Sequence, residues 1–225
     1  MRVDAEHISK RFNRRAVFKD ISFSIETGEV FGITGRNGSG KSTLLRIVGG
    51  LLTPSGGGIR YTLDGSMIAP ERLHQHIGYV APYLTLYEEF SAEENIALYA
   101  RIRGLAFHRR DAQDLLARVG LPLDRKDPIR AFSSGMKQRM RVVFAVLHRP
   151  PLLLLDEPIS NLDAEGMRTV YDLVAEFRAR GTVIIATNDN EDIAQCDRTI
   201  SVEAACCPWR PHDVRGGRMM SVEAA

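Results

Sequence analysis

Residues 35–43 read GRNGSGKST and match the pattern GxxxxGK[ST]. The mostly apolar run EVFGIT at 29–34 precedes them and is expected to form a short strand, and residues 42–48 have the spacing of a helix. A strand that runs into a glycine-rich loop and then a helix is the context in which this pattern forms a phosphate-binding loop, or P-loop. The sequence therefore predicts that a nucleotide binds at this point of the chain.

The residue types in this loop fit phosphate chemistry. Glycine lets the backbone curl until successive N–H groups face phosphate oxygens, and the N-terminus of the following helix adds positive potential. Lys41 is expected to neutralise charge on the β- and γ-phosphates, and the Ser42 hydroxyl is expected to ligate Mg²⁺. The predicted nucleotide-binding residues of the loop are Gly35, Arg36, Asn37, Gly38, Ser39, Gly40, Lys41, Ser42 and Thr43.

Two adjacent carboxylates follow a second apolar strand. Residues 152–155 are leucines, and Asp156 and Glu157 come directly after them. Because a parallel sheet presents ligands at the carboxyl ends of its strands, Asp156 is expected to face Mg²⁺. Glu157 is then placed to orient or deprotonate an attacking water, so Glu157 and Lys41 are the predicted catalytic residues. A solvated acidic turn is the other interpretation of Glu157.

The alternation of apolar strands with helical segments indicates an α/β fold with a mainly parallel sheet. The first thirty residues are expected to be strands, since apolar and polar residues alternate at 21–25. Further along, strands are expected at 77–80, 152–155 and 182–186, and helices at 136–147 and 164–180.

Residues 84–132 interrupt this alternation. The sequence SAEE at 91–94 has the form of a capping box and precedes a helical apolar pattern. A second helix is expected at 111–119. We therefore predict that residues 84–132 form a helical insertion in the α/β domain.

Two segments carry weaker signals. Residues 53–65 contain Pro54 and three successive glycines, and are expected to form turns around a short strand or hairpin. Residues 201–225 are expected to form either a terminal hairpin, with strands at 199–204 and 218–224, or a disordered tail.

The composition narrows the classes of function. The chain has 225 residues, a mass of 25.1 kDa and a net charge of +2. This balance gives no reason to expect a nucleic acid partner. No stretch reaches the roughly 20 apolar residues of a membrane helix, and the N-terminus lacks the apolar core of a signal peptide, so we expect a chain that neither spans a membrane nor is exported. The three cysteines show no zinc spacing and are expected to be reduced thiols.

Two further motifs resemble those of a known family. Residues 132–139, FSSGMKQR, resemble the LSGGQ-type signature of ABC ATPases, and SNLD at 160–163 resembles their D-loop. Together with the P-loop and LLLLDEP they follow the family's motif order over about residues 1–200, which are predicted to be a single domain. The resemblance implies a P-loop NTPase core with a mainly parallel sheet, an N-terminal antiparallel β subdomain and an inserted helical subdomain.

The resemblance also implies how the site is completed. In the family, two ATPase domains meet head to tail and hold each ATP between the P-loop of one copy and the signature of the other. Ser133 and the backbone of Ser134 and Gly135 are then expected to contact the γ-phosphate of an ATP–Mg²⁺ bound to another copy. Phe12 matches the aromatic position that stacks on adenine; a core phenylalanine is the other interpretation.

The chain departs from the family's pattern at several positions. Pro82 falls where a glutamine is usual, and proline cannot ligate Mg²⁺ or hold the attacking water through a side chain. Asn188 replaces the switch histidine; it can donate a hydrogen bond to a γ-phosphate but carries no positive charge. Ser134 and Met136 replace a glycine and a glutamine of the signature. These changes bear on the rate of hydrolysis more than on nucleotide binding.

The resemblance thus implies an ATP-hydrolysing subunit that powers a separate transmembrane permease. Such a subunit lies on the cytoplasmic face of the membrane, pairs with itself or with a paralogous ATPase, and docks its permease near the helical insertion and residues 83–90. The haem-exporter ATPases of cytochrome c maturation are one compatible subgroup. The alternatives are a nucleotide-binding switch with weak or no hydrolysis, and an ABC ATPase that acts outside transport.

Overall fold

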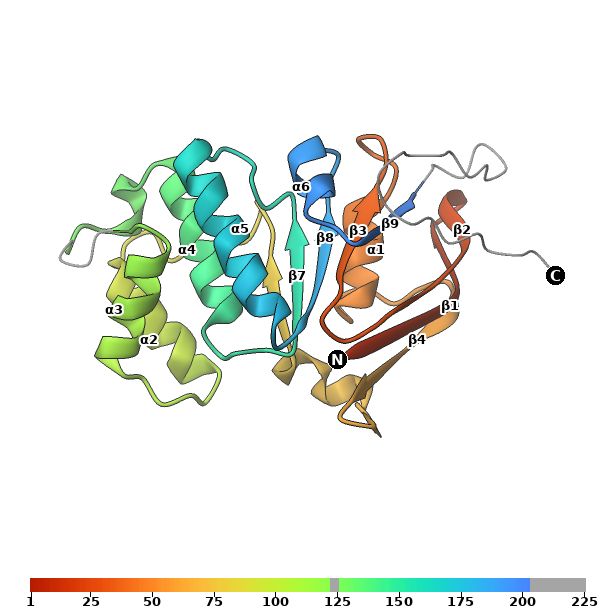
Figure 1. Cartoon of the computed structure of the whole chain (residues 1–225), viewed down its shortest axis with the longest axis horizontal. Coiled ribbons are helices and arrows are strands. Elements are labelled where there is room, and N and C mark those ends of the chain that lie inside the picture. The colour runs from red at the N-terminus through yellow and green to blue at the C-terminus, as the bar shows by residue number, and fades with distance from the viewer. Residues whose placement is uncertain (122–125, 203–225) are drawn as a thin grey trace.

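Two β-sheets organise the part of the chain that the structure describes. The computed structural model describes residues 1–121 and 126–202. Figure 1 shows a central sheet with helices on both sides and a second sheet next to the N-terminus. One sheet is antiparallel and the other is parallel.

The antiparallel sheet is formed by N-terminal strands and a later hairpin. In sheet order the strands are β2 (Arg15–Ile25), β1 (Arg2–Phe12), β4 (Gly56–Leu63) and β5 (Ser66–Met67). The glycines at 56–58, which the sequence predicts as turn residues, lie inside β4; Gly56 and Gly58 pair with β1, and Gly57 lies at the irregularity between these pairs. Gly57 has φ +79°, and a Cβ there would lie 2.3 Å from the carbonyl oxygen of Glu6. Glycine is therefore required where these two backbones approach each other.

The parallel sheet forms the centre of the molecule. In sheet order the strands are β6 (Ile77–Val80), β7 (Leu152–Asp156), β8 (Thr182–Ala186), β3 (Val30–Thr34) and β9 (Arg198–Ser201). Every residue of β7 and β8 is buried, as expected for strands covered on both faces. The strands predicted at 77–80 and 182–186 are confirmed, and β7 extends one residue further than predicted, to Asp156.

The last strand differs from its prediction. The sequence predicts residues 199–204 as one strand of a hairpin, but β9 pairs in parallel with β3, with Arg198 opposite Phe31. Residues 187–197 return the chain to the edge where the parallel strands begin, which a parallel pairing requires. The other predicted hairpin strand, at 218–224, lies outside the described residues.

The helices of the described residues are α1 (Lys41–Val48), α2 (Ala92–Ile102), α3 (Arg109–Arg118), α4 (Ser134–Val146), α5 (Ala164–Arg178) and α6 (Asn190–Ala194), with the 3₁₀ helices η1 (Pro70–Gln75) and η2 (Ile129–Ala131). Those predicted at 42–48, after Ser91, and at 111–119, 136–147 and 164–180 are present close to those limits, whereas the short helix α6 and the two 3₁₀ helices were not predicted. The predicted capping box is confirmed, because Ser91 and Glu94 bond reciprocally at the start of α2. Helix α4 begins two residues before its prediction because the Ser133 hydroxyl accepts the N–H of Met136 and caps the helix there.

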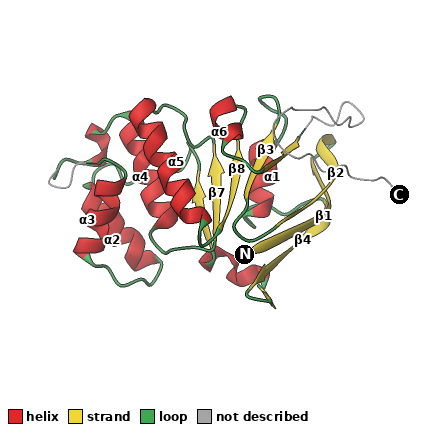
Figure 2. Ribbon diagram, viewed as in Figure 1, coloured by secondary structure: helices red, strands yellow, loops and turns green. Residues whose placement is uncertain are grey.

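Alternate residues of β7 pack into two separate hydrophobic cores. Leu152 and Leu154 belong to the core shared with α1 and the antiparallel sheet. Leu153 and Leu155 belong to the core shared with α2, α3, α4 and α5. Figure 2 shows the resulting layers, with the parallel strands between α1 and the α4–α5 pair. These findings confirm the predicted fold class, while the boundaries 1–200 and 84–132 remain predictions.

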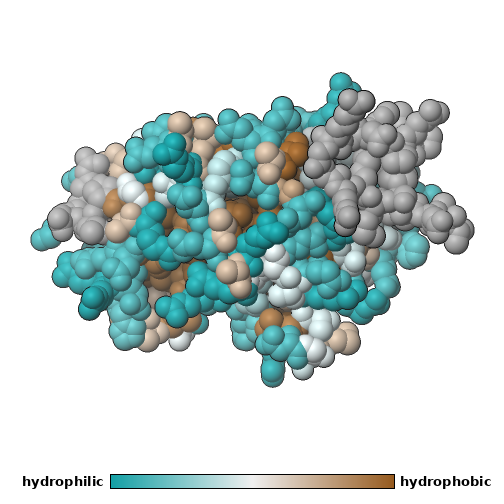
Figure 3. Space-filling model, viewed as in Figure 1, coloured by the Kyte–Doolittle hydropathy of each residue, from teal (hydrophilic) through white to brown (hydrophobic). Residues whose placement is uncertain are grey.

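The face of the molecule seen in Figure 3 is mainly polar. Small apolar areas lie among the polar ones. Within residues 1–121 and 126–202, no helix combines the length and apolar character needed to cross a membrane.

Candidate active site

The P-loop joins β3 to α1 at the carboxyl edge of the parallel sheet. Gly40 is the N-cap residue of α1 with φ +109°, and no side chain of the described residues caps this helix. A Cβ at Gly40 would lie 2.5 Å from Cγ1 of Val17, so both the backbone conformation and the available space require glycine. The first-turn N–H groups, from Lys41 onward, are thereby presented to an anion at the helix N-terminus.

Lys41 is buried within the loop, with 5% of its surface exposed. Its Nζ donates to the carbonyl oxygens of Gly35, at 2.9 Å, and Arg36, at 3.3 Å. Both partners are neutral, so they hold the ammonium group in place without cancelling its charge. Neither partner is a carboxylate, so the ammonium group remains available to an anionic ligand.

Ser39 contributes a buried hydroxyl that lacks a partner. The residue is 3% exposed, and among the described residues its Oγ makes no hydrogen bond. Leaving a buried hydroxyl unpaired costs about 1–3 kcal/mol. Phosphate oxygens are strong acceptors, so a nucleotide in the P-loop would satisfy this group. The orphaned hydroxyl is an independent sign that the loop fits phosphate.

Ser42 and Asp156 join α1 to the end of β7. The Ser42 hydroxyl donates to Asp156 Oδ1 at 2.8 Å, and Asp156 is 2% exposed. Burial raises the pKa of Asp156, and the hydrogen bond from Ser42 opposes that rise. The positive charges of Arg46 and Lys41 also oppose it. The structure thus brings together the two residues that the sequence predicts as Mg²⁺ ligands.

Glu157 follows β7 in an unusual backbone conformation. Its φ is +48°, and its N–H donates to the carbonyl oxygen of Ala186 at 2.9 Å. The left-handed region costs on the order of 1 kcal/mol for a residue with a Cβ. Such conformations cluster at functional sites, where the surrounding structure enforces them. The half-buried Glu157 therefore stands at the sheet edge that also carries the P-loop.

Asn188 follows β8 and reaches the P-loop. Its Nδ2 donates to Oδ1 of Asn37 at 3.0 Å. The preceding residue, Thr187, donates its hydroxyl to Asp192 Oδ2 at 2.7 Å, and the Tyr171 hydroxyl donates to Asp192 Oδ1 at 3.0 Å. Burial raises the pKa of Asp192 to about 6. This network fixes the loop that carries Asn188 against α5 and α6.

Phe12 lies at the end of β1, and its ring is partly exposed to solvent. It is 50% exposed, and Nζ of Lys10 lies 4.9 Å from the centre of its ring. Phe12 pairs with Arg15 of β2, and Val17 of the same strand adjoins Gly40. An exposed ring on the strand pair that adjoins Gly40 favours the stacking interpretation over a core phenylalanine.

The signature residues lie away from the P-loop of the same chain. Ser133 caps α4, and a Cβ on Gly135 would lie 3.0 Å from the carbonyl oxygen of Asn161 in the D-loop segment. Helix α4 packs on β6, whereas the P-loop follows β3, and β7 and β8 lie between these strands. Three strand spacings amount to about 14 Å. The predicted site residues therefore form two groups, with Ser133, Ser134 and Gly135 separate from the rest.

Comparison with protein families decides the assignment. The family model described as ABC transporter matches residues 18–160. The chain belongs to the ABC transporter family. It is an ATP-binding cassette, the ATPase component of this family, and the predicted family resemblance is confirmed.

Several characterised proteins are similar to this ABC ATPase. The linearmycin resistance ATP-binding protein LnrL of Bacillus subtilis is 34% identical over 202 residues, covering 87% of this chain and 64% of LnrL. The lipoprotein-releasing system ATP-binding protein LolD 1 of Caulobacter vibrioides is 37% identical, covering 89% of this chain and 92% of LolD 1. The cytochrome c biogenesis ATP-binding export protein CcmA of Nitrosococcus oceani is 33% identical, covering 90% and 93%. The chain thus spans just under two thirds of LnrL and nearly all of the other two.

Solved structures of ABC cassettes share the fold. The ATP-binding subunit of an ABC transporter matches with a TM-score of 0.79 and 28% identity, over 90% of this chain and 86% of that chain. The cassette MJ0796, solved as a dimer in a post-hydrolysis state bound to ADP and Pi, matches with a TM-score of 0.78 and 25% identity, over 89% and 94%. Dimerisation is therefore known for a cassette of this shape.

A cluster that the sequence reasoning missed lies beside the nucleotide site of the ABC ATPase. Arg46 of α1 contacts Tyr83, which follows β6, and Tyr83 in turn contacts Tyr79 of β6. One signal was present, because Arg46 follows Ser42 by four residues and so shares its face of α1. The tyrosines gave no such signal, since only the fold brings β6 and the following loop against α1.

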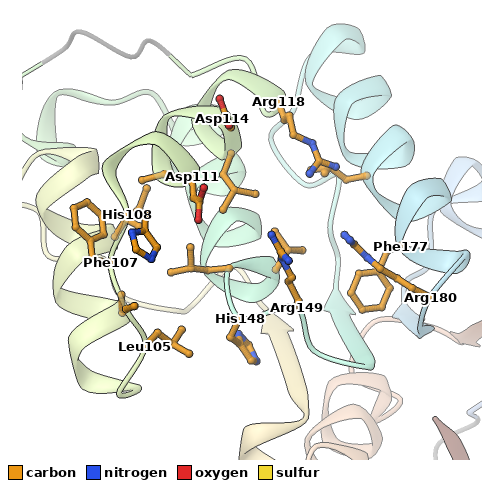
Figure 4. Close-up of a pocket in the computed structure, with 18 residues that line it drawn as sticks. Leu105, Phe107, His108, Asp111, Asp114, Arg118, His148, Arg149, Phe177 and Arg180 are labelled. Carbon is orange, nitrogen blue, oxygen red and sulfur yellow. The ribbon is translucent and has the colours of Figure 1, made fainter.

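The cavity drawn in Figure 4 is separate from the nucleotide site. It has a volume of about 610 Å³ and lies between α2 and α3 on one side and the carboxyl ends of α4 and α5 on the other. Phe107, Arg149 and Phe177 are among its lining residues, and none of the predicted site residues is. The buried lysine, the unpaired hydroxyl and the Ser42–Asp156 pair meet at the P-loop and not at this cavity.

Proposed function

We propose that this ABC ATPase hydrolyses ATP as a head-to-tail dimer and drives a separate transmembrane permease from the cytoplasmic face of the membrane. The observation that carries the proposal is the 2.8 Å hydrogen bond between Ser42 and Asp156. It joins the helix after the P-loop to the strand that ends in two carboxylates. A triphosphate, a metal and an attacking water need groups from these elements at one place.

The P-loop binds the triphosphate of ATP. Lys41 supplies a buried positive charge, Ser39 an unpaired hydroxyl, and the start of α1 free N–H groups. These groups attract an anion by charge, by hydrogen bonding and by the helix dipole. We assign the phosphate contacts to residues 35–43, and adenine stacking to Phe12.

Ser42 and Asp156 fit Mg²⁺. Both offer oxygen atoms, which this cation prefers, and they already lie within hydrogen-bond distance. The described residues contain no cluster of three or more His, Cys, Asp or Glu side chains that would hold a metal alone. Such a site suits an ion that one or two protein oxygens share with substrate phosphates and water. Bound Mg²⁺ would neutralise charge on the β- and γ-phosphates.

Glu157 acts on the attacking water as the general base. It follows the proposed metal ligand Asp156 directly, and the hydrogen bond from its N–H to Ala186 fixes it at the end of the sheet. A carboxylate held at this edge is positioned to accept a proton when water attacks the γ-phosphate. Asn188 donates a hydrogen bond to the γ-phosphate from the loop after β8.

A second copy completes the site. The signature residues at 133–135 are separated from the P-loop of their own chain by the width of the sheet. Ser133 is the exposed N-cap residue of α4, and a helix N-terminus in this position suits an anion presented by another molecule. The dimeric state of the similar cassette MJ0796 supports this arrangement. Whether the second copy is identical or paralogous does not alter the geometry.

The permease docks on residues 83–90. This segment exposes three aromatic side chains, Tyr83 at 49%, Tyr87 at 56% and Phe90 at 41%. A group of exposed aromatic residues on a polar surface marks an interaction site. LolD 1 and CcmA are named for a lipoprotein-releasing system and for an export function, which supports a role in transport.

A second candidate is a nucleotide-binding switch with little hydrolysis. Pro82 and Asn188 favour it, since neither supplies the side-chain chemistry of the glutamine and histidine usual in the family. The retention of Lys41, Ser42, Asp156 and Glu157 favours the ATPase.

The substitution Glu157→Gln tests the proposal. It keeps the shape of the side chain and removes its basicity, so turnover should fall about 10²- to 10⁴-fold. ATP binding should persist, since a negative charge near the γ-phosphate is removed. ATP–Mg²⁺ should then hold a dimer, which size-exclusion chromatography with light scattering would detect.

Glu165→Gln is the matched control, because it makes the same change at an exposed position of α5. It should leave turnover and mass unchanged. Equal rates for the parent and Glu157→Gln would remove Glu157 from the mechanism. A parent without turnover, even beside its permease, would favour the switch.

A further inference from the structure

Asn37 and Gly38 lie at the exposed tip of the P-loop. The N–H of Ser39 donates to the carbonyl oxygen of Arg36 at 3.0 Å, which closes a tight turn. Asn37 and Gly38 are the central residues of that turn, and both are exposed. Gly38 has φ +78°, and a Cβ added there would meet nothing within 4 Å. Both the side chain of Asn37 and the backbone after it are therefore open to water.

An asparagine that precedes glycine can lose its side-chain amide without an enzyme. The backbone nitrogen of the next residue attacks the side-chain carbonyl carbon, and glycine has no side chain to hinder the approach. Here the nitrogen of Gly38 attacks Cγ of Asn37, a new C–N bond forms, and the C–N bond of the side-chain amide breaks. The amide nitrogen leaves as ammonia, with the proton of the attacking N–H. Water then opens the cyclic imide at one of its two carbonyls, which leaves aspartate or isoaspartate at position 37.

The nucleotide-free loop favours this attack. Among the described residues, the N–H of Gly38 donates no hydrogen bond. Oδ1 of Asn37 accepts Nδ2 of Asn188 at 3.0 Å. Negative charge grows on this oxygen as the nitrogen attacks, and a fixed donor stabilises such charge. The empty loop thus presents an unpaired nucleophile next to a polarised carbonyl group.

A bound nucleotide opposes the attack in two ways. Gly38 belongs to the residues that we assign to phosphate, and a phosphate oxygen that accepts its N–H holds the proton that the reaction must remove. Asn188 is assigned to the γ-phosphate, so its amide donor turns from Asn37 toward the nucleotide. The loaded loop therefore loses both the free nucleophile and the donor on the carbonyl oxygen.

The products fit the turn but oppose ATP. Aspartate has the shape of asparagine, and its carboxylate accepts the hydrogen bond from Asn188, which is then charge-assisted. The new negative charge lies in the loop that faces the phosphates, and it repels them. Isoaspartate carries the same charge and also lengthens the backbone of the turn by one methylene group.

We propose that Asn37 is a site of spontaneous deamidation, which inactivates the cassette while it is empty and is suppressed while nucleotide is bound. The inference rests on the proposed function, since it assigns regulation to that same site. An idle cassette loses its nucleotide site with time, whereas a loaded one keeps it.

Peptide mass spectrometry follows the reaction in the full chain. The parent is incubated without nucleotide at mildly alkaline pH. Asn13 and Asn161 are internal controls, because they are exposed but precede arginine and leucine. Asn37 should convert to the acid while both controls remain amides. With AMP-PNP–Mg²⁺ at about ten times its dissociation constant, roughly a tenth of the chains are empty, so conversion of Asn37 should slow about tenfold.

Calorimetric titration with ATP–Mg²⁺ gives the functional readout. The number of high-affinity sites per chain should fall in step with conversion of Asn37. Asn37→Asp reproduces one product, and it should bind ATP–Mg²⁺ about 10- to 100-fold more weakly than the parent because of the added charge. Its melting temperature without nucleotide should match that of the parent.

Asn37→Gln is the matched variant for the incubation. It keeps an amide but places the carbonyl carbon one methylene further along the side chain, so that attack by Gly38 has to close a larger ring. Whatever its starting affinity, its number of sites should stay constant during an incubation in which the parent loses its own.

Three outcomes would overturn the inference. One is conversion of Asn37 no faster than that of Asn13 or Asn161. Another is an equal rate with and without AMP-PNP in a parent that binds it. The third is an unchanged number of ATP sites after Asn37 has converted. A parent that binds no AMP-PNP would overturn the proposed function and the protection with it, whereas conversion of Asn37 is measured in the free chain and stands or falls separately.

Discussion

The side-chain amide of Asn188 donates to Oδ1 of Asn37 at 3.0 Å, which links the loop after β8 to the P-loop. The two residues are 151 positions apart in the sequence. This contact places a hydrogen-bond donor beside the loop that binds phosphate. The contact supports the proposal that Asn188 takes the place of the switch residue as an uncharged donor.

We expect Asn188→Ala to weaken binding of AMP-PNP and leave ADP unaffected. Asn188 is proposed to contact the γ-phosphate, which ADP lacks. Losing one hydrogen bond to a charged group costs about 1.5–3 kcal/mol, or at least tenfold in affinity. Isothermal titration calorimetry with each nucleotide and Mg²⁺ measures the difference. An equal loss for both nucleotides would assign Asn188 to folding of the P-loop instead.

We expect Lys41→Ala to weaken ATP binding by about 2–4 kcal/mol, because the buried phosphate charge loses its cation. Lys19→Ala, which removes a lysine from an exposed position of β2, is the control and should bind normally. Calorimetric titration of ATP–Mg²⁺ compares the two variants with the parent. Unchanged affinity in Lys41→Ala would contradict the P-loop assignment.

We expect Phe12→Ala to weaken ATP and GTP to a similar degree, by roughly 1–3 kcal/mol. Stacking depends on a flat ring and not on the pattern of hydrogen-bonding groups, so it tolerates either base. Phe107→Ala removes a ring of comparable exposure at the distant cavity and should change neither affinity. A loss confined to ATP, or no loss, would count against stacking on Phe12.

We expect the free energy of unfolding to fall as the pH rises and Asp192 loses its proton. Its folded pKa is raised by burial from the usual 3.8 to about 6, so between these values the folded state keeps a proton that the unfolded chain has lost. Its stabilising contribution is therefore present below pH 3.8 and is lost as pH rises through 6. A shift of this size corresponds to about 3 kcal/mol.

Asp192→Asn removes this titration. The difference in free energy of unfolding, variant minus parent, should therefore rise between pH 4 and pH 7. Urea unfolding at several pH values measures the difference. Loss of the hydrogen bond from Tyr171 gives a constant offset and leaves this slope intact. Asp114→Asn, at an exposed position of α3, should track the parent at every pH. A constant difference between Asp192→Asn and the parent would contradict the prediction.

The local sequence determined the elements and the P-loop. Apolar runs identify β7 and β8, and the glycine pattern identifies a loop that needs left-handed backbone conformations. Capping signals at Ser91 identify the start of α2. These features depend on neighbours along the chain, so they can be predicted without a structure. The hairpin predicted around residues 53–65 is present as β4 and β5, but the location of the glycines at 56–58 inside β4 was not predicted, because the close approach of β1 that requires glycine comes from a distant segment.

Tertiary structure decided which residues meet. The order β6-β7-β8-β3-β9 brings Ser42 to Asp156 and Asn37 to Asn188, and it keeps the signature away from the P-loop of its own chain. No spacing in the sequence predicts that Tyr83 bonds to Arg46 or that Ser39 is buried without a partner. Those facts depend on packing between segments far apart in the sequence. The sequence by itself therefore determined what kind of site this protein has, and only the fold decided which side chains connect that site to the rest of the molecule.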